Sequence, residues 1–84
     1  MRCYVYRSKR KAETYLYLPE AEGFSVVPDV LMRVFGPPEL AMDLVLSPHR
    51  RLASEDVLVV LRNLLDRGFH LQMPPADVFS TTSH

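Results

Sequence analysis

Four tyrosines, the only ones in the chain, flank a basic cluster near the N-terminus. Aromatic rings on a sheet surface can stack on nucleic-acid bases, which contributes about 1–3 kcal/mol per base, and neighbouring cations can neutralise phosphates. Alternatively, the tyrosines are amphipathic strand residues beneath a covering layer, and the basic residues form a solvated loop. We favour this alternative for the tyrosines. The candidate macromolecule-binding residues are Tyr4, Tyr6, Arg7, Lys9, Arg10, Lys11, Tyr15 and Tyr17.

Two other groups of residues could do chemistry. Arg50 and Arg51 precede a predicted helix, where free backbone N–H groups favour an anion, although Glu55 and Asp56 also follow there. His70 and Asp43 could act as an acid–base pair if their strands are neighbours. Otherwise His70 is a hydrogen-bonded structural histidine, which is the commoner role for a single histidine in a strand.

Familiar catalytic patterns are missing from the sequence. We find no Ser–His–Asp order, no phosphate-binding glycine loop and no clustered metal ligands, and the chain has three glycines and three histidines. Cys3 lies in an apolar strand, which raises a thiol pKa and makes the thiol unreactive. We therefore expect no catalytic residue, no cofactor and no metal site, and we lean against an enzyme.

The spacing of apolar residues predicts the elements that position these side chains. Alternation predicts strands, a 3.6-residue period predicts helices, and proline and glycine mark the boundaries. The order is ββαβαβ in an α/β domain. Because two strand–helix–strand connections favour parallel strands, we expect the last three strands to be parallel and the first to run against them in a mixed four-stranded sheet. The elements expected are strands over 2–6, 13–18, 40–46 and 69–73, a helix from Pro28 to Gly36, and a helix capped by Ser54 and ended by Gly68.

The register of the first two strands decides where the tyrosines point. If Tyr6 pairs with Tyr15, all four rings share one face, and Cys3, Val5, Leu16 and Leu18 form the other. This apolar pattern favours that register.

Length and charge limit the possible classes of protein. The 84 residues predict one domain over 1–79 with a short flexible tail over 80–84. A net charge of zero argues against attraction of the whole domain to nucleic acid or anionic lipid. A single cysteine and no signal-peptide pattern predict the reducing cytoplasm, and no apolar run is long enough to span a membrane.

Several short strings together resemble the YcgL family of small bacterial proteins. They cover about residues 3–79, and the resemblance implies a three-layer α/β/α sandwich. It implies no activity, cofactor or catalytic residue, because the family has none established. The strings are Cys3, Tyr6–Ser8, Thr14–Tyr17, Val27–Pro28, Leu31–Met32, Phe35–Pro38, Leu40–Met42, Gly68–Phe69 and Leu71–Pro75.

Three functional hypotheses follow. The first is a small non-catalytic cytoplasmic domain that binds another macromolecule, for which we favour a protein over a nucleic acid. The second is a weak RNA-binding module that uses the basic hairpin loop. The third is an enzyme or small-ligand site near His70 and Asp43.

Overall fold

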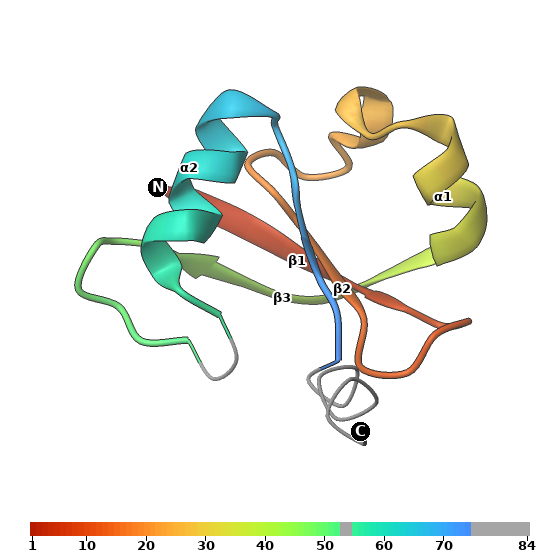
Figure 1. The fold of residues 1–84 in the computed structure, drawn as a ribbon, viewed down its shortest axis with the longest axis horizontal. Helices are drawn as coiled ribbons and strands as arrows, with labels where there is room; N and C mark the ends of the chain where they lie inside the picture. The colour runs from red at the N-terminus through yellow and green to blue at the C-terminus, as the bar shows by residue number, and fades with distance from the viewer. Residues whose placement is uncertain (53–54, 75–84) are drawn as a thin grey trace, which may run out of the picture.

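The computed structural model describes residues 1–52 and 55–74 (Figure 1). The predicted order ββαβαβ is confirmed. The predicted cap Ser54 and the predicted tail over 80–84 lie outside the described residues. The elements are β1 (Arg2–Ser8), β2 (Tyr15–Leu18), a 3₁₀ turn (Phe24–Val26), α1 (Asp29–Phe35), β3 (Pro38–Val45), α2 (Val57–Asp66) and β4 (His70–Gln72).

The four strands form one sheet in the order β3-β1-β2-β4, with a helix on each face. Figure 1 shows the helices on opposite sides of the strands, α2 at the left and α1 at the right. The α/β/α sandwich that the family resemblance implied is therefore present. The core under α2 contains Cys3, Val5, Tyr17, Leu46, Val57, Val60 and Leu64, and the core under α1 contains Tyr6, Leu16, Leu18, Val27 and Phe35.

The sheet is antiparallel at every pairing, so the predicted mixed sheet was wrong. β2 and β3 do run in the same direction, since both are antiparallel to β1, but β4 runs against them. The reason lies in the connection from β3 to β4. Its loop passes over the sheet face, where Leu52 packs on the core, and α2 then leads back to the end where β3 finished. Parallel strands are preferred when the connection crosses the sheet face once. Here the loop crosses the face in one direction and α2 crosses it back.

The register of the hairpin also differs from the prediction. Tyr6 pairs with Leu16 and Arg7 pairs with Tyr15, so the two tyrosine pairs lie on opposite faces. Tyr4 and Tyr6 face α1, whereas Tyr15 and Tyr17 face α2. One-residue shifts of this kind exchange the two faces of a strand completely.

Each helix has a local signal at one boundary. The side chain of Asp56 accepts a hydrogen bond from the backbone N–H of Leu58 at 2.9 Å and thereby caps α2. Gly36 ends α1 with φ 79°, a conformation that favours glycine. Neither α-helix among the described residues is long and apolar enough to cross a bilayer.

Candidate functional site

The basic hairpin loop is tied to the rest of the domain by two of its four cations. The guanidinium of Arg7 forms an ion pair with Glu39, which raises the pKa of Arg7 and lowers that of Glu39. Nη1 of Arg10 donates to the carbonyl of Arg33 at 2.6 Å. Lys9 and Lys11 are exposed and form no ion pair with a described carboxylate. The loop therefore presents two lysines for a partner.

The tyrosines do not form one stacking surface. Tyr6 and Tyr17 are 5% and 6% exposed, and they lie in different cores. The ring of Tyr6 packs edge-on against Phe24, and its hydroxyl accepts from the backbone N–H of Glu22 at 2.8 Å. Tyr4 and Tyr15 are half-buried on opposite faces. Four rings covered in this way work mainly as core residues.

His70 and Asp43 lie far apart, on the two edge strands and on opposite faces of the sheet. The condition for an acid–base pair, that their strands are neighbours, is not met, so a site built from both is excluded. The buried ring of His70 instead contacts Nδ2 of Asn63 through Nδ1 at 2.9 Å and the carboxylate of Glu55 through Nε2. It also packs edge-on against Tyr17. These contacts hold α2 against β4, which is the structural role considered from the sequence.

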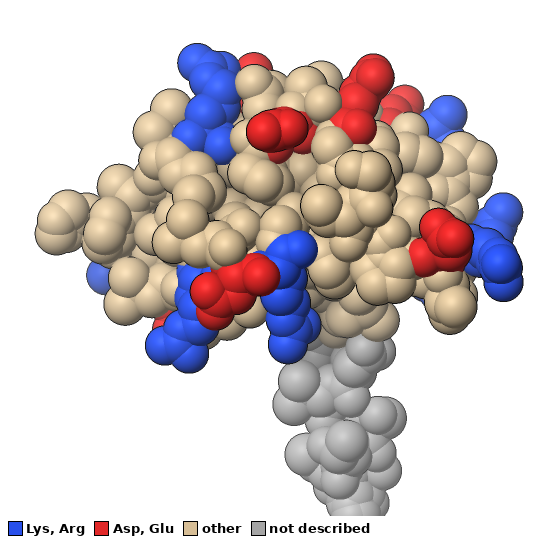
Figure 2. Space-filling model, turned by 90° about the horizontal axis from the view of Figure 1, so that it is seen from above, with Lys and Arg blue, Asp and Glu red and all other residues tan. Residues whose placement is uncertain are grey.

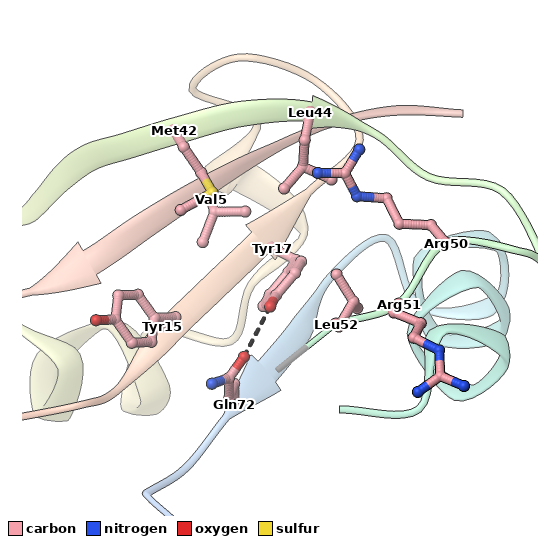
Figure 3. A pocket seen from close by; sticks show the side chains of 9 residues that line it. All are labelled: Val5, Tyr15, Tyr17, Met42, Leu44, Arg50, Arg51, Leu52 and Gln72. Carbon is pink, nitrogen blue, oxygen red and sulfur yellow. Dashed lines mark hydrogen bonds between the residues drawn. The ribbon is translucent and has the colours of Figure 1, made fainter. Parts of the chain in front are cut away.

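A pocket of about 230 Å³ lies on the α2 face, beyond the part of the sheet that α2 covers (Figure 3). All four strands contribute to its floor, because alternate side chains of neighbouring strands share a face. The loop after β3 forms its wall. The floor consists of Val5, Tyr15, Tyr17, Met42, Leu44 and Gln72, and the wall consists of Arg50, Arg51 and Leu52.

Polar groups in the pocket are few. The hydroxyl of Tyr17 donates to Oε1 of Gln72 at 2.7 Å (Figure 3). Burial raises the pKa of Tyr17 to about 12, so this hydroxyl keeps its proton at neutral pH. Arg50 and Arg51 are exposed, and within the described ranges neither forms an ion pair.

The sequence drew attention to the two arginines but not to the pocket. They were expected beside a helix start, whereas they line a cavity whose floor comes from strands far apart in the chain. The period of two in Tyr15, Tyr17, Met42 and Leu44 was a usable signal for the floor. It could not show which part of the face α2 leaves uncovered.

The outer edge of β3 is the second feature that sequence reasoning missed. β3 is eight residues long, and among the described strands it pairs only with β1. The register of this pairing shifts between Val5 and Tyr6, so Leu40 and Met42 lie on opposite faces. Apolar side chains are exposed on both faces: Leu40 is 56% exposed, Met42 51% and Val45 54%. A long edge with exposed apolar side chains is a template for pairing with another strand.

The face shown in Figure 2 is mainly uncharged, and both acidic and basic side chains are scattered over it, with several acidic groups along its upper edge. Among residues 1–52 and 55–74 there is no group of three or more His, Cys, Asp or Glu side chains that could hold a metal ion. The described thiol, Cys3, is buried, and burial raises its pKa to about 11.

Comparison with known proteins agrees with the resemblance found in the sequence. The model of the YcgL domain matches residues 3–75. A YcgL domain-containing protein of Pseudomonas putida (strain W619) is 56% identical over 75 residues, which are 89% of this chain and 77% of that protein. One from Thioalkalivibrio sulfidiphilus is 52% identical over 75 residues, 89% of this chain and 93% of that protein. One from Pseudomonas aeruginosa is also 52% identical, over 89% of this chain and 77% of that protein.

Proposed function

The chain belongs to the YcgL family, and from the exposed edge of its sheet we propose that it is a small non-catalytic domain that binds another protein. The partner contributes an extended segment that pairs with the outer edge of β3. Binding of this kind takes its affinity from backbone hydrogen bonds and its specificity from alternate side chains.

The exposed side chains of β3 support this proposal. An added strand would place side chains next to Leu40 on one face and Met42 on the other, so apolar surface would be removed from water on both sides of the sheet. Burial of apolar area contributes about 25 cal/mol per Å². The edge therefore offers hydrophobic contacts in addition to backbone pairing.

The charges of β3 do not oppose an incoming strand. Glu39 forms an ion pair with Arg7, and Asp43 forms one with Arg2 at 3.4 Å. Both acidic residues of the strand are thus paired with arginines of β1, and the outer edge carries no unpaired charge of its own among its eight residues.

A lysine substitution on the outer edge of β3 tests the proposal, because charged residues on an edge strand prevent pairing with another strand. In the experiment, wild-type protein is used to isolate a partner from a bacterial extract, and the affinity of the purified pair is then measured by calorimetry. We expect Leu40→Lys to weaken the affinity at least about tenfold, since a buried unpaired charge is costly. Leu65→Lys is the matched control, because Leu65 is 72% exposed on α2, away from β3.

Three results contradict the proposal. The first is equal affinity of the two lysine variants, and the second is the absence of any partner in the extract. The third is a concentration-dependent dimer of the wild type that Leu40→Lys dissolves, because the edge would then pair with a second copy. Binding of single-stranded RNA that is lost in Lys9→Ala/Lys11→Ala would favour the hairpin loop instead and replace the protein partner by a nucleic acid.

The proposed place of action is the cytoplasm. The lone thiol of Cys3 supports it, because one cysteine forms no disulfide within the chain and a reducing compartment keeps it free.

A further inference from the structure

The pocket on the α2 face combines an apolar floor with a cation, Arg50, that forms no ion pair with a described carboxylate. We propose that it binds a small carboxylic acid with an aromatic or branched apolar body. The body packs on the floor of the sheet and the carboxylate meets the guanidinium group of Arg50, which lies beside Leu44, whereas the guanidinium of Arg51 points away from the floor (Figure 3). The site shares Met42 with β3 but does not include Leu40, which lies on the opposite face of the sheet.

The shape of the pocket favours a compact apolar body. Six side chains from four strands make the floor, and among them Val5, Met42 and Leu44 present only apolar atoms or a thioether. The rings of Tyr15 and Tyr17 add flat surface from β2, as Figure 3 shows. A volume of about 230 Å³ accommodates one ring or a short branched chain but no large cofactor.

The charge of the wall favours an anion. Three other arginines of the domain are engaged: Arg2 and Arg7 form ion pairs, and Arg10 donates to a carbonyl. Within the described residues, the side chain of Arg50 donates one hydrogen bond, from Nη1 to the carbonyl of Val45, and at 3.4 Å this bond is long. Such a contact leaves the other guanidinium N–H groups available for a ligand.

A carboxylate suits this wall better than a phosphate. Arginine binds a carboxylate through two parallel hydrogen bonds, and a single negative charge is less costly to bring beside an apolar floor than a double one. The amide oxygen of Gln72 is already used by the hydroxyl of Tyr17. Its NH₂ group remains as a donor and adds to the preference for an acceptor ligand.

Phenylacetate is a suitable probe, and phenylacetamide is its neutral counterpart of the same shape. Titration into isotopically labelled protein, followed by NMR, should give binding in about the millimolar range for the acid, as expected for so small a ligand. We expect the shifts to centre on Tyr15, Tyr17 and Gln72. The amide should bind at least about tenfold more weakly, because it carries no negative charge and has only one oxygen, so it cannot form the ion pair with two parallel hydrogen bonds.

Variants connect the binding to Arg50. Arg50→Gln should lose at least about tenfold in affinity for phenylacetate. Arg62→Gln should keep it, since Arg62 is exposed on α2 and does not line the pocket. Leu40→Lys should also keep it, which distinguishes this site from the proposed protein-binding edge.

Four results would overturn the proposal. These are equal binding of the acid and the amide, equal binding by Arg50→Gln and Arg62→Gln, and shifts that lie outside the pocket. The fourth is binding of inorganic phosphate with the same affinity and the same shifts, which would reduce the site to a general attraction of anions to exposed arginines.

Discussion

Single residues in this domain serve packing more than chemistry. His70, Tyr17 and Cys3 are the residues that a search for reactive groups would select, and all three are buried. His70 has polar partners on both ring nitrogens, and Tyr17 uses its hydroxyl to fix Gln72. The sequence predicted a raised pKa for the Cys3 thiol from its apolar strand, and burial of Cys3 does raise that pKa.

The buried thiol has a consequence for stability at high pH. Burial raises the pKa of Cys3 from 9.0 to about 11. Between these values the unfolded chain loses the proton and the folded chain keeps it, so the free energy of unfolding falls as the pH rises. At about 1.4 kcal/mol per pKa unit, the loss is on the order of 2 kcal/mol.

Cys3→Ala removes this contribution and isolates it. Urea unfolding from below pH 9.0 to about pH 11 should show a shallower decline for the variant than for the wild type, after the constant cost of the smaller side chain is subtracted. Burial also raises the pKa of Tyr17, and both proteins share that effect. Parallel pH profiles would mean that the thiol ionises equally in the folded and unfolded states.

Elements could be predicted well from the sequence, but their pairing could not. Leucine and tyrosine alternate in β2, and apolar residues alternate with tyrosine in β1, so both faces of the hairpin are suited to burial. The apolar pattern therefore carries little information on register. The turn sets it instead: the N–H of Ser8 donates to the carbonyl of Thr14 at 3.0 Å, and Oγ of Ser8 accepts from the backbone N–H groups of Arg10 and Lys11.

The end of α1 gives a test at the same scale. Gly36 has φ 79° and ψ −170°, a region that is essentially restricted to glycine, and an added Cβ would lie 3.1 Å from Nε of Arg10. We expect Gly36→Ala to lower the free energy of unfolding by about 1–3 kcal/mol in urea.

The same Gly36→Ala substitution in a protein that lacks the Arg10 side chain separates the two causes of that loss, which are backbone strain and crowding. In Arg10→Gly the contacts with Nε, Cβ and Cζ of Arg10 are gone, while the backbone conformation at residue 36 remains. Most of the loss should persist there. Full recovery in this background would assign the cost to crowding, and an unchanged stability of Gly36→Ala in the wild-type background would contradict the requirement for glycine.

At the scale of the whole molecule, the sequence predicted an α/β domain with six elements in the right order, and the family resemblance supplied the layers. The surfaces that matter for binding could not be predicted in the same way. The edge position of β3 depends on the strand order, and the pocket depends on the path of the loop over the face. Both are set by contacts between segments distant in sequence, such as Leu52 with the core under α2.

The central claim is that β3 accepts a strand from another protein, and amide hydrogen exchange of the complex tests it most directly. In the free domain, the backbone N–H groups of residues 39–45 that point away from β1 should exchange rapidly, because β3 pairs on one side only within the described residues. The account predicts that these outward amides become protected when the partner binds. Unchanged exchange along β3, with new protection confined to the loop that carries Lys9 and Lys11, would contradict it.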